Sequence, residues 1–118
     1  MNDNIIYSYT RQDAINDGVT IDVTRVANKN GFTIPVAVTR TLWERYINQE
    51  TEAETDLKLN ALLLMLYQKI LTEAKTKESF FATKVTINNK EVDIWMGIEA
   101  TSPSDPSPAM TIMMPEDW

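Results

Sequence analysis

The chain has 118 residues, of which 43% are hydrophobic and 24% are charged, and its formal net charge is −6. This length fits one compact domain, so we expect residues 1–118 to form a single unit. The sequence contains no histidine and no cysteine, which excludes disulfides, thiolate nucleophiles, imidazole acid–base chemistry and Cys/His metal sites.

The first 48 residues alternate between short extended and short helical patterns. Threonine stands before two of the helices as an N-cap, and glycine follows two of them, where it can end a helix. The predicted strands cover residues 5–9, 19–23 and 32–38, and the predicted helices cover residues 11–17, 24–30 and 40–48. Pro35 has no N–H donor, which places the third extended segment at a sheet edge or in an irregular stretch.

Residues 56–75 predict a long helix that Thr55 caps. Its inward side consists of Leu57, Leu59, Leu62, Leu63, Leu66, Ile70 and Ala74, and this side is widened by Leu64, Met65, Tyr67 and Leu71. A helix that is apolar so far around its axis is expected to be covered on more than one side, so we interpret it as the central helix of the fold. A partner-binding groove is the alternative explanation for the excess apolar surface.

The last third of the chain has the alternation of β-strands. Residues 80–87 and 90–99 predict a hairpin, because a turn at Asn88-Asn89 places the apolar residues of both strands on one side. Residues 101–108, rich in proline and serine, predict a loop before a third strand over residues 109–114. The predicted fold class is therefore α+β: a three-stranded antiparallel C-terminal sheet, open to extension by the N-terminal strands, packed on the long helix.

The other side of this sheet would also be apolar. It carries Phe80, Trp95 and either Met110 or Met113. Either the N-terminal segments cover this face, or a second subunit covers it in a homodimer formed near Trp95.

Charge and hydropathy limit the classes of partner. Acidic residues exceed basic ones in both halves of the chain, which makes a nucleic-acid partner unlikely on electrostatic grounds and leaves a DNA mimic as a weak alternative. The longest apolar run covers residues 61–67, far short of the ~20 residues that span a membrane. With no export signal pattern, the expected compartment is the cytoplasm.

Three carboxylates near the N-terminus are the strongest candidates for a cation site. Asp13, Asp17 and Asp22 could together hold a hard cation such as magnesium. Each also has a local role in capping a helix, preceding a helix stop or alternating on a strand. We therefore expect no metal, no cofactor and no catalytic residue.

A small-molecule or protein contact is predicted around the first strand and helix. Tyr7 and Tyr9 alternate on one side of a strand, and Arg11 and Arg40 each follow a capping threonine. Because a positive charge in a first helical turn opposes the helix dipole, both arginines are candidates for contacts with an acidic partner or ligand. The structural alternative is that Arg11 pairs with an acid such as Asp22.

A set of short motifs runs through the N-terminal part and the C-terminal strand. It consists of residues 6–11 (Ile-Tyr-Ser-Tyr-Thr-Arg), 14–15, 17–19 and 22–24, then 31–32, 35–40 (Pro-Val-Ala-Val-Thr-Arg), Trp43 and 110–117 (Met-Thr-Ile-Met-Met-Pro-Glu-Asp). In these motifs the chain resembles a family of small uncharacterised proteins, a domain of unknown function, carried by phages, plasmids and integrated mobile elements of bacteria. The resemblance implies a mobile-element origin and transfers no catalytic residue.

The function predicted from these observations is that of a non-enzymatic accessory protein of a mobile element. It would act by binding another protein, for example to modulate a host factor. The alternative is a small-ligand or nucleotide-binding domain that uses Tyr7, Tyr9, Arg11 and Arg40, and an enzyme ranks third.

Overall fold

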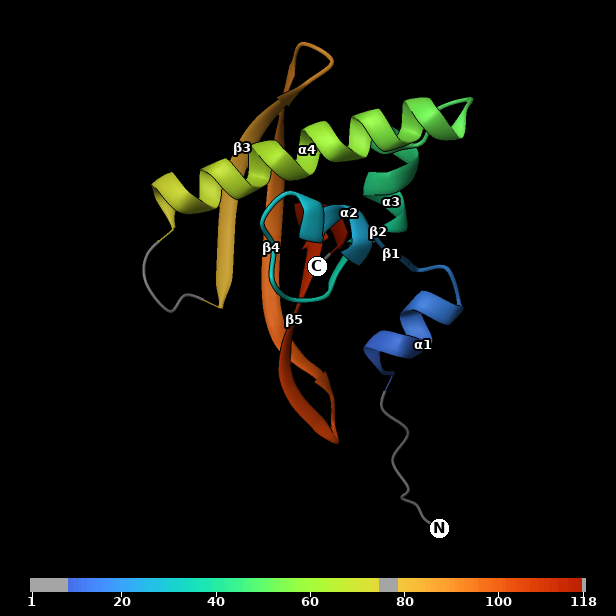
Figure 1. Cartoon of the computed structure of the whole chain (residues 1–118), viewed down its shortest axis with the longest axis vertical. Helices are drawn as coiled ribbons and strands as arrows, with labels where there is room; N and C mark the ends of the chain where they lie inside the picture. The colour runs from blue at the N-terminus through green and yellow to red at the C-terminus, as the bar shows by residue number, and fades with distance from the viewer. Residues whose placement is uncertain (1–8, 75–78, 118) are drawn as a thin grey trace.

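The computed structural model describes residues 9–74 and 79–117. It is an α+β fold in which one long helix crosses a five-stranded sheet (Figure 1). The elements in chain order are α1 (Arg11–Asn16), β1 (Thr20–Asp22), α2 (Thr24–Lys29), β2 (Val36–Thr39), α3 (Arg40–Leu42), the π-helical turn η1 (Trp43–Ile47), α4 (Glu52–Glu73), β3 (Phe80–Ile87), β4 (Lys90–Ser102), β5 (Asp105–Met113) and the 3-10 turn η2 (Pro115–Asp117).

The strand order of the sheet is β1-β2-β5-β4-β3. The chain's N-terminal strands therefore do extend the C-terminal sheet, which has five strands rather than three. The N-terminal and C-terminal strands meet where β2 pairs with β5. This pair is parallel, with Val36 opposite Met110, whereas every other pair is antiparallel. This places β5, a strand formed late in the sequence, at the centre of the sheet.

The predicted hairpin is confirmed. Ile87 pairs with Lys90 and Val85 pairs with Val92, as the alternation of apolar residues requires. Asn88 and Asn89 have φ of 52° and 64°, the left-handed conformation that a two-residue hairpin turn demands.

Two sequence expectations around proline are wrong. The strand after Pro35 is internal, and all four of its residues are buried. The proline is compatible with this position because it stands just before the strand, and only its carbonyl takes part in the sheet, accepting from the Met110 N–H at 2.8 Å. The predicted loop over residues 101–108 is mostly strand, since β4 continues to Ser102 and β5 begins at Asp105. Pro106 and Pro108 are tolerated because this end of the hairpin is exposed and irregular in register.

The long helix begins one turn earlier than predicted. The Thr51 hydroxyl accepts the Glu54 N–H at 3.1 Å, so Thr51 is the N-cap and the acidic residues 52 and 54 lie in the first turn, where the helix dipole favours them. Thr55, predicted as the cap, is buried inside the helix, and its hydroxyl accepts the Gln49 N–H at 2.8 Å.

The hydrophobic core lies between α4 and one face of the sheet, with α2 and α3 beside the helix (Figure 1). Leu59, Leu62, Leu63 and Leu66 of α4 point into it. We call the opposite side of the sheet the outer face. The N-terminal helix α1 covers part of the outer face, because Arg11 donates to the hydroxyl of Thr111 there. Among the described residues, no helix is long and apolar enough to cross a membrane.

The N-terminal elements follow the predicted order. The capping box of α1 is present, since the Thr10 hydroxyl accepts the Asp13 N–H and the Asp13 carboxylate accepts the Thr10 N–H. The first predicted strand, residues 5–9, lies outside the described residues except for Tyr9, which is not in a strand.

Candidate interaction surface

The side of α4 that faces away from the sheet carries three exposed leucines. Leu57, Leu64 and Leu71 are 71%, 43% and 67% exposed. They are spaced by seven residues, almost two helical turns, so they lie in one line along the helix. We call these three residues the leucine row. The sheet, α2 and η1 cover α4 on more than one side, as predicted, but the exposed leucines show that the cover is incomplete and that Leu57 does not belong to the inward set.

The positions between the leucines carry no charge. Asn60 and Ala61 lie between Leu57 and Leu64, Gln68 lies between Leu64 and Leu71, and all three are exposed. The charged residues of this helix stand to the sides of the row: Lys58, for example, donates to Asn88 of the hairpin at 2.8 Å. The result is an uncharged apolar strip with polar margins, the arrangement typical of a helix that packs against another helix.

Neighbouring elements hold α4 in place along both margins of the leucine row. On one side the Asn30 side-chain amide donates to Asn60 at 2.8 Å, and the Tyr67 ring lies over Gly31 and against Phe32, with ring centroids 5.5 Å apart. On the other side the helix is tied to the hairpin through Lys58. The row is therefore presented by a fixed helix, so a partner would lose little of its affinity to ordering this surface.

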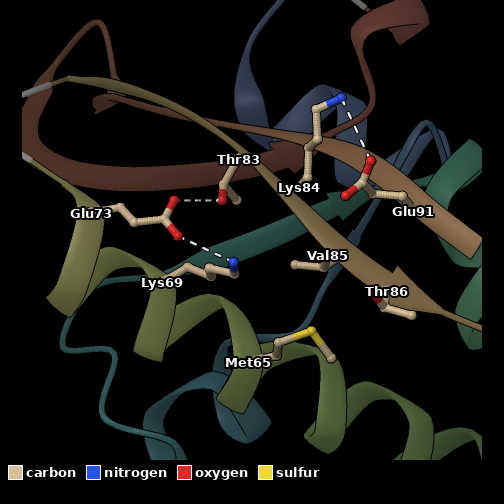
Figure 2. Close-up of a pocket in the computed structure, with 8 residues that line it drawn as sticks. All are labelled: Met65, Lys69, Glu73, Thr83, Lys84, Val85, Thr86 and Glu91. Carbon is tan, nitrogen blue, oxygen red and sulfur yellow. Dashed lines mark hydrogen bonds and ion pairs between the residues drawn. The ribbon is translucent and has the colours of Figure 1, made fainter.

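A groove of about 520 Å³ lies on the edge of the sheet, between α4 and β3 (Figure 2). Its charges compensate one another: Lys69 lies 3.1 Å from Glu73, and Lys84 lies 3.9 Å from Glu91. The Thr83 hydroxyl donates to Glu73 at 2.9 Å. This bond and Lys69 together lower the pKa of the Glu73 carboxyl below its ordinary value. The groove holds no unbalanced charge that would attract an ionic ligand.

The outer face near Trp95 has a second, smaller groove with an apolar surface. Phe80 and Trp95 form an edge-to-face pair with centroids 5.3 Å apart. A groove of about 430 Å³ beside them runs past Gly97 and Met113. Met113 is thus the methionine on this side, whereas Met110 faces the core.

The described members of the predicted binding set, Tyr9, Arg11 and Arg40, form hydrogen bonds at different places around α1. Tyr7 lies outside the described residues, and the exposed Tyr9 donates its hydroxyl to Asp17 at 2.8 Å. Arg11 reaches from the first turn of α1 to β5, whereas Arg40 donates through Nε to the carbonyl of Gly18, beyond the other end of α1, at 2.6 Å. The two arginines therefore fasten α1 from opposite ends, and a common binding site for them stays a prediction.

Arg11 occupies a half-buried position. Its Nη1 donates to the Met110 carbonyl at 3.1 Å and to the Thr111 hydroxyl at 3.2 Å. Burial lowers the pKa of the guanidinium, and the carboxylates of Asp22 and Glu99 act in the opposite direction. The acid named in the sequence analysis, Asp22, thus acts on Arg11 through its charge. Two nearby carboxylates make this position unfavourable for an anionic ligand.

The three aspartates considered for a cation have separate contacts. Asp13 caps α1, Asp17 accepts from Tyr9, and Asp22 accepts from the backbone and hydroxyl of Thr24. Within residues 9–74 and 79–117, no group of three acidic residues is arranged to hold a metal ion.

The sequence offers a partner-binding surface on this helix only as an alternative, and the structure shows which leucines are exposed and aligned. The signal was available as the seven-residue spacing of Leu57, Leu64 and Leu71, which differs from the spacing of the buried set. No curated protein and no solved structure matches the chain. One family model, described as a family of unknown function (DUF6573), matches residues 1–118. The chain therefore belongs to the DUF6573 family.

Proposed function

We propose that this protein is a non-enzymatic binding module that holds an amphipathic helix of a partner against the leucine row. The observation that carries the proposal is the exposure of three aligned leucines on a helix whose opposite face is fully packed. Burying one leucine side chain is worth about 1.5–3 kcal/mol, so a partner that covered all three would gain a substantial part of its binding free energy there.

The form of the row determines the kind of partner. A straight strip with a seven-residue repeat matches the apolar stripe of another helix, whose side chains fit between those of the row. Because the strip itself is uncharged, the partner's contacting stripe is apolar as well, and charged side chains belong at its margins.

The biological setting is part of the same proposal. The motif resemblance described above supports an accessory role in a bacterial mobile genetic element, where the bound helix would belong to a host or element protein in the cytoplasm. The cysteine-free composition is compatible with that compartment. The net charge of −6 disfavours nucleic acid as the partner.

The outer face near Trp95 is a second candidate surface. The groove past Gly97 and Met113 supports it. The leucine row is favoured because Leu57 and Leu71 are each about two-thirds exposed or more, whereas Phe80 is 40% exposed and packs edge to face against Trp95.

The proposal is tested by photo-crosslinking in cells that express the protein. A photoreactive phenylalanine derivative replaces Leu64, and a matched control carries it at Ser107, an exposed position on β5 far along the chain from α4. We expect one discrete protein adduct at position 64 and none at position 107.

The protein found in the adduct is then purified and titrated with this protein. The double variant Leu57→Lys/Leu71→Lys should weaken binding about tenfold or more. An absence of adducts at position 64, or affinity unchanged in the double variant, would contradict the proposed function.

A further inference from the structure

We infer that the helix held by the leucine row is α4 of a second copy of this chain, packed antiparallel about an axis at Leu64. This inference rests on the proposed function of the row as a helix-binding surface. It adds the identity and the orientation of the bound helix.

The row is complementary to itself. Leu57 and Leu71 stand seven residues to either side of Leu64. In an antiparallel pair centred on Leu64, Leu57 therefore packs against Leu71 of the second copy, and Leu64 packs against its own equivalent. A single surface supplies both halves of the contact, as a two-fold symmetric interface requires.

The residues between the leucines also fit this pairing. In this register Ala61 falls opposite Tyr67 of the second copy and Gln68 falls opposite Asn60, so no charged side chain stands at these positions. A small residue in the strip allows the helix backbones to approach, and no charge has to be removed from water.

The distribution of charge on α4 selects the antiparallel orientation. The first part of the helix carries Glu52, Glu54 and Asp56 against a single Lys58, whereas Lys69 and Glu73 balance each other near its end. A parallel pair would bring two acidic ends side by side. In an antiparallel pair these ends lie at opposite ends of the interface, so their repulsion is small.

The position of α4 leaves room for the second copy. The helix crosses in front of β3 and β4 (Figure 1), and its leucine row faces away from the sheet. None of the elements described by the structure covers the row. The row is therefore open on the side that faces away from the sheet.

The open edge of β3 is a less suitable place for a second copy to add. Lys84 stands in the middle of this edge strand, close to Glu91 and Asp93 on β4. A lysine at such a position is a common protection against edge-to-edge pairing of sheets.

Disulfide trapping tests the pairing directly, because the chain has no cysteine of its own. Leu57→Cys and Leu71→Cys variants, of which one carries a mass tag, are mixed and oxidised. We expect the 57–71 crosslink to exceed the 57–57 and 71–71 crosslinks, and a Leu64→Cys variant to crosslink to itself. The exposed control Ser107→Cys should give only background. Predominant 57–57 and 71–71 crosslinks would overturn the antiparallel arrangement.

Sedimentation equilibrium tests the association without any crosslink. The unmodified chain should be a dimer at high concentration, and Leu64→Lys should raise the dissociation constant at least about tenfold. Far-UV circular dichroism of Leu64→Lys should be unchanged, since the position is exposed. A chain that is monomeric up to millimolar concentration would overturn the inference, and so would a dimer that Phe80→Lys disrupts and Leu64→Lys does not.

The two proposals fail in distinguishable ways. If the chain is monomeric but still gives a photo-adduct with a different protein at position 64, the proposed function stands and the second copy is not the partner. If the chain is monomeric and gives no adduct, both proposals fail.

Discussion

Leu63 and Leu64 are neighbours in sequence with opposite surroundings. Leu63 is completely buried against the core, whereas Leu64 belongs to the leucine row and is 43% exposed. Leu63→Asp should unfold the protein, because an unpaired buried carboxylate costs several kcal/mol, comparable with a total stability of about 5–15 kcal/mol. Leu66→Asp should act in the same way.

Leu64→Asp is the matched control. Its thermal midpoint at low protein concentration, where association does not contribute, should stay within a few degrees of the unmodified chain. Equal loss of structure in Leu63→Asp and Leu64→Asp would show that α4 is buried on both sides.

Two glycines with positive φ differ in what a side chain would meet. At Gly31 (φ +105°) a Cβ atom would lie 2.6 Å from the Tyr67 ring, and at Gly18 (φ +76°) it would lie 2.8 Å from the tip of Arg40. The ring is held by Phe32, whereas the exposed Arg40 side chain can move. Gly31→Ala should therefore lower the free energy of unfolding more than Gly18→Ala does. The backbone strain alone is worth about 1–3 kcal/mol.

Urea unfolding of both glycine variants measures this difference. Gly97→Ala serves as the reference, since its nearest atom outside the local chain is 4.0 Å away. If Gly31→Ala and Gly18→Ala lower the free energy of unfolding equally, backbone strain alone, and not the Tyr67 ring, determines the loss of stability.

At the scale of elements, we expect the contact between α4 and β3 to depend on pH. The Thr83 hydroxyl and, to a smaller extent, Lys69 lower the pKa of Glu73 in the folded protein. Because the pKa of Glu73 is lower in the folded protein than in the unfolded chain, the stabilisation that its ionised carboxylate gives is complete above the pKa of the unfolded chain. This stabilisation is lost as the pH falls through the pKa of the folded protein. The thermal midpoint of the unmodified chain should therefore approach that of Glu73→Gln as the pH falls from about 6 to about 3.

The NMR titration of the Glu73 carboxyl identifies the cause. Thr83→Val should move its pKa upward, toward the ordinary value, because the largest cause of the shift is removed. A midpoint difference between the unmodified chain and Glu73→Gln that does not change with pH would contradict this prediction.

Elements with a local signal could be predicted, and elements defined by distant contacts could not. The Asn88-Asn89 turn and the Thr10 cap specify their own geometry, so the hairpin and α1 were found from sequence. The parallel pairing of Val36 with Met110 has no local signature, so the sequence around Pro35 predicts an edge strand or an irregular stretch instead of an internal strand. The excess apolar surface of α4 is visible in the sequence, but the seven-residue spacing alone leaves open which of the leucines are covered, so a partner-binding surface is only an alternative there.

The predicted contact site around Tyr9, Arg11 and Arg40 also depends on distant contacts that the sequence does not show. A charge that opposes a helix dipole is visible in the sequence, but the acceptor of its hydrogen bonds is not. The structure gives Arg11 the carbonyl of Met110, which is 99 positions away in the chain.

For the whole molecule, the central strand is the most sensitive part. Because β5 pairs with β2 on one side and with β4 on the other, a chain shortened after Ser104 loses the junction between the two halves of the sheet. We expect this shortened chain to lack a cooperative thermal transition. Ser107→Ala, in the exposed part of the same strand, should melt like the unmodified chain. A cooperative transition in the shortened chain would show that the halves fold independently.

The central place of β5 also affects how the protein is made in the cell. Met110 is 74 positions after its partner Val36, and at about 5–20 residues per second the ribosome needs about 4–15 s to synthesise that interval. During this time β2 and the apolar side of α4 emerge without the strand that completes their core. A nascent chain in this state is a natural client for a chaperone, and slow codons placed before residue 105 would lengthen its exposure to aggregation.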